Sequence, residues 1–532
     1  MMALLSLLQI TFLLISTGDA YNILIMHPTP SYSHQKPLMA LTEALIKKGH
    51  QLFVVSPNPV PGLEKNYTYV DLSASYKYFA KNIDAKKENF VNLQMQHTKW
   101  DSPSSLFGMY SAIAVRQYNT TQFSQFYERV KRDKIKFDVA LIETFFIPSG
   151  CAMVRQLGGY GVPMIVFSTI GTAAFGGEDP ITEHPSYHPF LLSTFTDRMN
   201  IWQKIDNWVS KYFVEGAIKK MMEDHARNYF RESHGPEYEK LVDGCWSNKS
   251  LSIISSNFLY GYPRLLGPNV VEVGPMHIDK KLEKLPQHVQ DWLDGAEKGV
   301  VFFSLGSNMQ SSNLPETVRL NFLKYFSELP VGYRVLWKWE AGGKIPGQSD
   351  NILTIKWSPQ QSILAHPKIK VFITQGGLQS FQEAVHYGVP TVGIPWFGDQ
   401  ELDTAKMVDA GIGTRILPEE LHSYEKIKTS LDAVLYDERY MKNMKRHSAI
   451  SHDFTWQAVD KAVFWVEHVA KFGGAPHLRP STADATYFEF FCLDIISVIL
   501  VLSLIVFYIV ILVYRFLTNQ IFSLVKIKVK KL

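Results

Sequence analysis

In one window of the chain, glycines and residues with hydroxyl, acid and amide side chains follow one another in the order that a phosphate-binding turn requires. Residues 371–400 read VFITQGGLQSFQEAVHYGVPTVGIPWFGDQ, an apolar run that leads into Gly376-Gly377 and then into a helix-forming segment. Backbone N–H groups at the start of that helix, from Leu378 to Ser380, lack partners within the helix, and the helix dipole is positive there. The window therefore predicts a turn between a strand and a helix that binds phosphate groups.

Metal-dependent chemistry is not favoured by the sequence. The chain contains no His-Glu-x-x-His, Cys-x-x-Cys or Walker motif, and no pair of aspartates is separated by a single residue. Those spacings commonly hold zinc or a magnesium-bound nucleotide. We therefore expect no metal site and no bound cofactor.

Alternating strand and helix patterns surround this window. Residues 21–27 form a short apolar run, leucines then recur at helical spacing up to Gly49, and residues 51–55 form a second apolar run. Continuous apolar runs are typical of parallel strands buried on both faces. A loop rich in proline and serine is expected between the first strand and the helix, as far as His34.

The second half of the chain repeats this order. Residues 299–307 read as a strand that runs into a turn, and residues 371–374 and 391–394 read as further strands. The helix between the last two is expected to stop at Gly388, with Pro390 just beyond. Strand, helix and strand in succession predict a parallel sheet in each half.

The chain is therefore expected to form two doubly wound α/β domains that face a cleft, with ligands at the carboxyl ends of the strands. Glycine and proline punctuate the stretch between the halves. We place the N-terminal domain at residues 21–262, a linker at 263–286 and the C-terminal domain at 287–480.

Composition agrees with a globular protein of this size. Of 532 residues, 46% are hydrophobic and 20% are charged, which excludes a disordered or collagen-like chain. The net charge of +4 is too small over this length to favour nucleic acid as the partner. Cys151 and Cys245 are able to pair, whereas Cys492 lies beside a very apolar stretch and is expected to stay free.

Both ends of the chain carry targeting patterns. Residues 1–20 form an apolar run that ends in small residues, as a secretory signal does. Residues 493–514 are apolar and long enough to cross a membrane as a helix, and the tail at 515–532 is basic. Positive charge after the span places the tail in the cytoplasm, so we expect a single-pass type I protein with a lumenal body.

Short motifs suggest the compartment. Lys528 and Lys530 match the dilysine signal that retrieves membrane proteins to the endoplasmic reticulum, although a basic cluster that attracts anionic lipid remains the alternative. Three sequons, at Asn66, Asn119 and Asn248, are usable for glycosylation in a lumenal body.

The segment 180–230 is rich in aromatic residues, among them Trp202, Trp208, Tyr212 and Phe213. Packing of these side chains in the core is the favoured interpretation. Contact with a membrane surface, or with an apolar substrate entry, is the alternative.

The window 371–400 closely resembles the signature of the UDP-glycosyltransferase family, the membrane-bound enzymes that conjugate small lipophilic molecules with sugars. The similarity extends through Trp357-Ser-Pro-Gln360, residues 474–479 and both ends of the chain. The variant Gln375-Gly-Gly-Leu-Gln looks most like insect and insect-virus members. This resemblance implies a GT-B type fold and a UDP-sugar site in the C-terminal domain.

The family pattern implies a role for each residue of the donor site. Trp357 would stack on uracil, Gln360 would bond to it, and Glu383 would hold the ribose hydroxyls. Many relatives have His at the position of Gln375, whose amide is a weaker neutral donor to the diphosphate. The resemblance also implies diphosphate contacts for Ser307, Gly377 and Ser380, and sugar-hydroxyl contacts for Asp399 and Gln400.

The family also implies a general base and its partner. His34, after the first strand, would take the proton of the acceptor hydroxyl. Glu143, where the family usually has Asp, would fix the imidazole tautomer and stabilise the imidazolium. His27 is interpreted as a structural residue.

The leading hypothesis is therefore an inverting, metal-independent transfer of a hexose from a UDP-sugar, with UDP-glucose favoured, to a hydroxyl of a small lipophilic acceptor. Detoxification, or conjugation of a hormone or pigment, would be its purpose. A lumenal protein that binds nucleotide sugars or lipophiles without turnover is the alternative, and an anchored adhesion protein is a third. The sequence leaves a homo-oligomer open.

Overall fold

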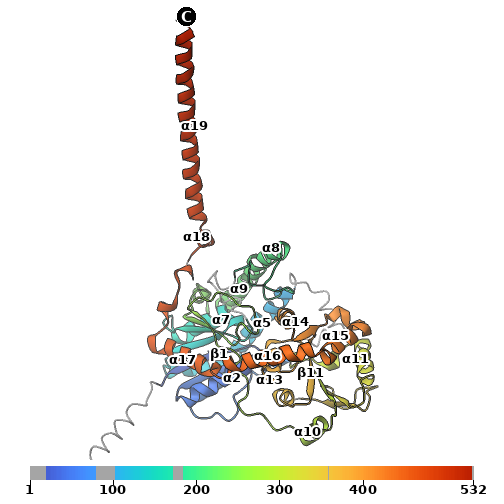
Figure 1. Cartoon of the computed structure of the whole chain (residues 1–532). Helices are drawn as coiled ribbons and strands as arrows, with labels where there is room; N and C mark the ends of the chain where they lie inside the picture. The colour runs from blue at the N-terminus through green and yellow to red at the C-terminus, as the bar shows by residue number, and fades with distance from the viewer. Residues whose placement is uncertain (1–19, 79–101, 172–183, 358, 484, 530–532) are drawn as a thin grey trace, which may run out of the picture. The chain divides into compact units, whose positions relative to one another are not determined.

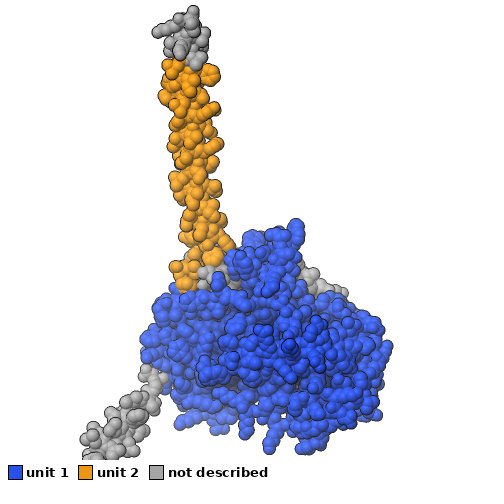
Figure 2. All heavy atoms as spheres, in the orientation of Figure 1, with its two compact units in different colours: residues 1–177, 182–479 blue, residues 178–181, 480–532 orange. Residues whose placement is uncertain are grey.

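The computed structural model describes residues 20–78, 102–171, 184–357, 359–483 and 485–529. The chain divides into two compact units, of which the first ends at Arg479 and the second begins at Pro480 (Figure 2). The predicted signal at 1–20 lies outside the described residues except for Ala20.

The first half of the chain forms a seven-stranded parallel sheet with strand order β3-β2-β1-β4-β5-β6-β7. Its strands are β1 (Asn22–Met26), β2 (Gln51–Ser56), β3 (Tyr67–Asp71), β4 (Val139–Glu143), β5 (Met164–Ser168), β6 (Leu251–Ile254) and β7 (Val270–Glu272). Alternate residues of β1 enter different cores, since Leu24 packs on one face and Ile23 and Ile25 pack on the other. Burial on both faces explains the continuous apolar runs.

Helices cover both faces of this sheet (Figure 1). They are α2 (Tyr32–Lys47), α5 (Ser102–Tyr118), α6 (Thr121–Arg132), α7 (Ile147–Gly158), α8 (Ile201–Val209) and α9 (Glu215–His234). The 3-10 helices η2 (Thr144–Phe146) and η4 (Pro236–Val242) and the π-helix η3 (Ser210–Val214) adjoin them. The predicted loop is shorter than expected, because α2 begins at Tyr32 and His34 lies in its first turn.

The second half forms a six-stranded parallel sheet with strand order β10-β9-β8-β11-β12-β13. Its strands are β8 (Gly299–Ser304), β9 (Tyr333–Lys338), β10 (Ile352–Ile355), β11 (Ile369–Thr374), β12 (Thr391–Gly393) and β13 (Gly413–Arg415). Its helices are α10 (Gln287–Asp294), α11 (Glu316–Ser327), α12 (Gln360–Leu364), α13 (Leu378–Tyr387), α14 (Gln400–Asp409), α15 (Tyr424–Tyr436) and α16 (Glu438–Thr455), with turns η5 (Ser311–Asn313) and η6 (Pro418–His422). As predicted, α13 ends at Gly388, which has the left-handed conformation of a C-terminal cap.

The chain then returns to the first sheet, so the predicted boundaries need correction. After α16, which packs against α13, helix α17 (Ala458–Phe472) packs against α2 (Figure 1). Val463 and Val466 of α17 share a core with Ile23, although they fall within the predicted C-terminal domain 287–480. The predicted linker 263–286 likewise contains β7, a strand of the first sheet. Apolar surface on these segments is buried by the first sheet.

The second unit ends in a long apolar helix. Short turns η7 (Pro476–Leu478) and η8 (Ser481–Ala483) and helix α18 (Tyr487–Phe490) precede α19 (Leu493–Val529). Helix α19 contains an apolar span at Leu493–Leu524, in which an 18-residue window has a mean hydropathy of 3.3 and is not buried, so the span has the length and composition to cross a membrane. The apolar stretch is longer than the predicted 493–514, and the helix includes most of the predicted tail 515–532. Lys530 and the side chain of Lys528 lie outside the described residues.

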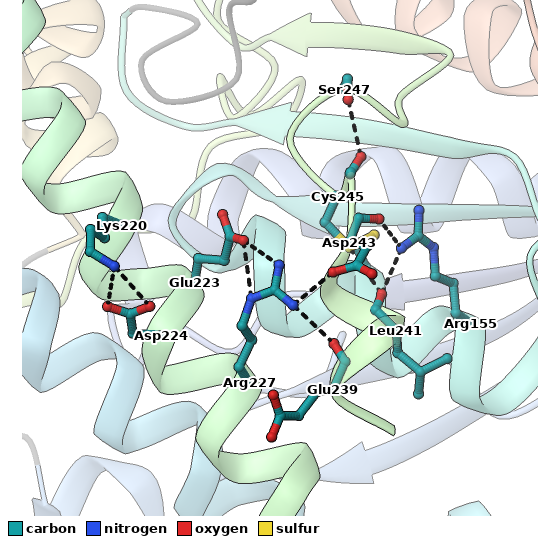
Figure 3. Close-up of polar contacts among 12 residues, drawn as sticks. Arg155, Lys220, Glu223, Asp224, Arg227, Glu239, Leu241, Asp243, Cys245 and Ser247 are labelled. Atoms are coloured by element: carbon teal, nitrogen blue, oxygen red, sulfur yellow. Dashed lines mark hydrogen bonds and ion pairs between the residues drawn. A yellow bond between two sulfur atoms is a disulfide. The ribbon is translucent and has the colours of Figure 1, made fainter. Parts of the chain in front are cut away.

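A disulfide and the ion pairs of Arg227 with Glu223 and Asp243 stabilise the region around α7 and α9 (Figure 3). Cys151 of α7 is bonded to Cys245, while Cys492 is free and exposed. Arg155 donates to the carbonyl oxygens of Leu241 at 2.6 Å and Asp243 at 2.7 Å. These contacts fix the segment that leads from α9 to β6.

Three of the four aromatic residues singled out in the segment 180–230 lie outside the core, contrary to the favoured interpretation, whereas Tyr229 and Phe230 of the same segment are buried in the core. Trp202 of α8 is 76% exposed, Phe213 of η3 is 63% exposed, and Trp208 is also exposed. Among the sequons, Asn119 and Asn248 are exposed, and Asn66 lies half-buried in the turn before β3.

Candidate active site

Three neighbouring strands of the first sheet bring the predicted base and its partner together. In the order β1-β4-β5 the carboxyl ends lie side by side. His34 follows β1 in the first turn of α2, Glu143 is the last residue of β4, and Thr169 directly follows β5. Ligands of doubly wound sheets bind at such strand ends.

The ring of His34 has a hydroxyl as its nearest polar partner. Nδ1 of His34 lies 2.9 Å from Oγ1 of Thr169 and 4.0 Å from Oε1 of Glu143. The predicted pair is therefore close but not directly hydrogen-bonded. Thr169 was missed in the sequence, where its only signal is a hydroxyl at the end of an apolar run.

Glu143 is buried and makes its own set of contacts. It accepts hydrogen bonds from the backbone N–H of Thr29 at 3.1 Å and from the Thr29 hydroxyl at 2.5 Å, and Nδ1 of His27 lies 3.4 Å away. Burial raises the pKa of Glu143 to about 8 and lowers the pKa of His34 to about 4. His27, interpreted as structural, lies against the same carboxyl, and burial lowers its pKa to about 3.

Aromatic rings form an apolar wall beside His34. The ring of Phe145 lies 6.0 Å from the imidazole, Tyr110 stacks on Phe145 at 5.4 Å, and Phe107 contacts Phe145 edge-on at 5.7 Å. Burial raises the pKa of Tyr110, and the charges of Glu143 and then Asp399 raise it further. Asp399 directly precedes α14, so charges from both halves of the chain act on this ring.

A cavity of about 200 Å³ lies between the two sheets at the carboxyl ends of β8 and β9. Helix α2 contributes Tyr32, Ser33 and Lys36 to its wall. Five residues predicted for the donor site line the same cavity, namely Ser307, Trp357, Gln360, Ser380 and Glu383.

Glu383 is the centre of a hydrogen-bond network in this cavity. Gln360 donates to it at 2.6 Å and to the Ser380 hydroxyl at 2.9 Å, and Gln361 donates to its other oxygen at 3.0 Å. Burial raises the pKa of Glu383, while the ammonium of Lys36, 3.8 Å away, acts in the opposite direction. The carboxylate is thereby fixed in position to accept hydrogen bonds from hydroxyls.

Trp357 presents an aromatic face to the cavity. Its side chain is 61% exposed, and the edge-on ring of Tyr32 lies 6.0 Å away. The ammonium of Lys338 lies 5.5 Å from the indole. An exposed indole in a polar cleft is suited to stacking on a planar ring.

The turn predicted between a strand and a helix is present between β11 and α13, and phosphate binding by this turn stays a prediction. Gly376 has φ +80°, and a Cβ there would lie 2.3 Å from Thr404. Gly377 is the N-terminal cap of α13. Oε1 of Gln375 and Oγ of Ser307 are buried without a hydrogen-bond partner among the described residues, which fits a polar ligand beside them.

Asp399 and Gln400 lie at the start of α14, and neither is among the described residues that line the cavity. Oε1 of Gln400 accepts from the backbone N–H groups of Trp396 and Phe397, at 2.9 and 3.3 Å. Burial raises the pKa of Asp399 to about 6.

No group of three or more metal-ligating side chains is gathered at one place in the part of the chain that the structure describes. The absence of a metal from the reaction stays a prediction.

Comparison with known proteins decides the family. Residues 23–531 match the family described as UDP-glucoronosyl and UDP-glucosyl transferase. The chain belongs to this family. It is a glycosyltransferase that moves a sugar from a UDP-sugar to an acceptor, as the resemblance implied.

Relatives of this UDP-glycosyltransferase span almost its whole length. UDP-glycosyltransferase UGT5 of Dactylopius coccus is 28% identical, covering 96% of this chain and 95% of the relative. UDP-glucosyltransferase 2 of the same organism is 30% identical, covering 93% of each chain. UDP-glucuronosyltransferase 2B9 of Macaca fascicularis is 28% identical, covering 93% of this chain and 92% of the relative.

Solved structures confirm the fold of this UDP-glycosyltransferase. A UDP-glucosyltransferase from Polygonum tinctorium superposes with a TM-score of 0.56 at 15% identity, covering 86% of this chain and 99% of that chain. CalG4, the calicheamicin glycosyltransferase, superposes with a TM-score of 0.54 at 16% identity, covering 85% of this chain and 98% of that chain. The predicted GT-B type fold, two Rossmann-like sheets facing a cleft, is therefore confirmed.

Proposed function

We propose that this enzyme transfers a hexose from UDP-glucose to a hydroxyl of a small lipophilic acceptor, with inversion and without a metal. The observation that carries the proposal is the placement of α2. Its first turns supply His34 to the apolar wall and Tyr32, Ser33 and Lys36 to the cavity of the second sheet. Helix α2 thus carries both the proposed base and residues that line the proposed donor cavity.

His34 is the general base in this mechanism. Its Nε2 takes the proton from the acceptor hydroxyl, and the hydroxyl oxygen forms a bond to the anomeric carbon. The bond from that carbon to the phosphate oxygen breaks on the opposite face, and UDP leaves with the electron pair. The imidazolium formed lies 4.0 Å from Glu143, and its charge favours the ionised carboxylate during transfer.

In the proposed mechanism, the second half of the chain forms the donor site. Trp357 stacks on uracil, Gln360 bonds to it, and Glu383 accepts from the ribose hydroxyls. The start of α13 binds the diphosphate through backbone N–H groups, with Ser307, Gln375, Gly377 and Ser380 around it. Asp399 and Gln400 hold hydroxyls of the transferred sugar.

We expect an apolar acceptor because an aromatic cluster lies on one side of the base. Phe145 lies beside His34, Tyr110 and Phe107 pack on Phe145, and a lipophilic alcohol or phenol suits this side of the base. We assign the enzyme to detoxification or to conjugation of a hormone or pigment. The apolar helix and the basic C-terminus support an endoplasmic reticulum membrane location, type I, with a glycosylated lumenal body.

The experiment crosses UDP-sugars with acceptors. Full-length protein in microsomes receives UDP-glucose, UDP-galactose, UDP-N-acetylglucosamine or UDP-glucuronate, with a panel of phenols and steroid-like alcohols. We expect UDP release that depends on the acceptor and is fastest with UDP-glucose. A different preferred donor would refute the choice of glucose. UDP release that never responds to an acceptor would refute the proposed transfer to small lipophilic hydroxyls.

A further inference from the structure

We infer that Thr169 is a positioning residue for His34, and that it joins the base to the helix that carries the donor-binding residues. The inference rests on the proposed function, in which His34 is the base. Two hydrogen bonds carry it, one at the hydroxyl of Thr169 and one at its backbone carbonyl oxygen.

The first bond fixes the imidazole. Oγ1 of Thr169 lies 2.9 Å from Nδ1 of His34, and Thr169 is fully buried. If Nδ1–H donates to this oxygen, Nε2 is left with its lone pair for the acceptor proton. A buried hydroxyl has few rotamers and holds the ring at one angle.

In the donor-free enzyme, Glu143 is less suited than Thr169 to fix the orientation of the His34 ring. It lies 4.0 Å from Nδ1, beyond hydrogen-bond distance, and Thr29 already donates to it twice. Burial raises the pKa of Glu143 to about 8, so its neutral form predominates near pH 7. A threonine hydroxyl accepts from Nδ1–H at every pH at which the enzyme is folded.

The second bond crosses the cleft. Nε2 of Gln379, on α13, donates to the carbonyl oxygen of Thr169 at 2.8 Å. His277 contacts the carbonyl oxygen of Gln379 at 3.2 Å. The neighbour of Gln379 in the sequence is Ser380, and Glu383 lies one turn further along α13. The helix that binds UDP in the proposed function is thus bonded to the residue that holds the base.

Replacement of the hydroxyl tests the inference. Thr169→Val keeps the shape of the side chain and removes the hydrogen bond. We expect kcat to fall about tenfold and the Kd of UDP to change by less than about twofold. Thr169→Ser restores the hydroxyl and is expected to recover kcat to within about threefold of wild type. If Thr169→Val folds poorly, Thr169→Ala tests the same bond.

The pH profile separates positioning from a general structural effect. Loss of the acceptor for Nδ1–H destabilises the imidazolium, so the acidic limb of kcat/KM for the acceptor should move to lower pH. In the double variant His34→Ala/Thr169→Val, loss of the hydroxyl should cause no further decrease beyond His34→Ala alone. Gln379→Met should lower kcat several-fold with the Kd of UDP retained.

Thr42→Val is the matched control. Thr42 lies buried on α2, the helix of His34, and its Oγ1 has no hydrogen-bond partner among the described residues. We expect wild-type kcat and an unchanged pH profile from this variant.

Several results would overturn the inference. Provided that His34→Ala is inactive, wild-type kcat in Thr169→Val would overturn it. So would an acidic limb of the Thr169→Val profile that stays in place or moves to higher pH. The third such result is a double variant His34→Ala/Thr169→Val whose loss of kcat equals the two single losses combined. Wild-type kcat in Gln379→Met would refute the link to α13. Turnover in His34→Ala would refute the proposed base itself, which is a separate outcome.

Discussion

The Nδ1 atom of His34 and the Oε1 atom of Glu143 are 4.0 Å apart, within strong electrostatic range but without a hydrogen bond. The carboxyl is the more buried partner, and Thr29 donates to it. Its protonation state therefore depends on burial and on the charge of the imidazole. This relationship makes the pH behaviour of Glu143 a test of the site.

Replacement of Glu143 should change how stability depends on pH. Burial raises the pKa of Glu143 to about 8, well above its value in the unfolded chain, so the folded protein binds the proton more tightly. This contribution to stability is complete below about pH 4.5 and is lost as the pH rises through 8. Glu143→Gln lacks this dependence.

The measurement is the free energy of unfolding of full-length protein in detergent, between pH 6 and pH 9. Relative to Glu143→Gln, the wild type should lose about 2–3 kcal/mol over this range. Parallel curves for the two proteins would show that Glu143 is not a perturbed acid.

Trp357→Ala should weaken UDP binding without loss of fold. Stacking of one base on an aromatic ring contributes about 1–3 kcal/mol, so the Kd of UDP should rise about 5- to 150-fold. Calorimetric titration with UDP measures this change. Trp456→Ala is the control, because Trp456 is similarly exposed and is not among the described residues that line the cavity. Equal Kd values for the two variants would exclude uracil stacking on Trp357.

Gln375 should tune donor binding without being essential. Its Oε1 atom is buried without a partner among the described residues, and its Nε2 atom is so close to Gly306 that a Cβ there would lie 2.5 Å away. Gln375→His adds a donor that can carry charge, worth about 1 kcal/mol at most, so KM for the UDP-sugar should change by up to about fivefold with kcat retained. Unchanged kinetics in both Gln375→His and Gln375→Ala would argue against contact with the diphosphate.

Much of the fold could be predicted because buried parallel strands have a simple pattern. The apolar runs became β1, β2, β8 and β11, and the glycines at 376 and 388 have the positive φ angles that such turns need. The strand, turn and helix of the window 371–400 were predictable for the same reason, since such a turn brings its residues together locally, whereas donor binding by this window stays a prediction.

Contacts between distant segments could not be predicted. The partnership of Thr169 and His34 depends on the strand order β1-β4-β5, in which β4 separates β1 from β5, and strand order is absent from local patterns. The amphipathic helix α17 has an apolar face, but its sequence does not say which sheet it covers. Trp202 and Phe213 are residue types that are common in cores, yet both side chains are exposed.

The basic C-terminus should retain the enzyme in the endoplasmic reticulum. If Lys528 and Lys530 are both changed to Ser, glycans at the sequons should mature beyond the high-mannose stage, because the retrieval receptor no longer binds. Sensitivity to endoglycosidase H measures this in cells, and Asn119 and Asn248 are exposed to the transferase that attaches glycans. Glycans that remain sensitive in the double variant, or sequons that are never glycosylated, would contradict the retrieval model.

His34→Ala tests the central claim most directly. A hydroxyl is a poor nucleophile at neutral pH, and general-base catalysis typically contributes about 10²- to 10⁴-fold in rate. The variant should therefore lose that factor in kcat while the Kd of UDP stays within about twofold of wild type, because the donor cavity depends on other residues of α2 and on the second sheet. Single-turnover kinetics with UDP-glucose and a phenolic acceptor, together with UDP titration, measure both quantities. A folded His34→Ala protein with near wild-type kcat would contradict the account.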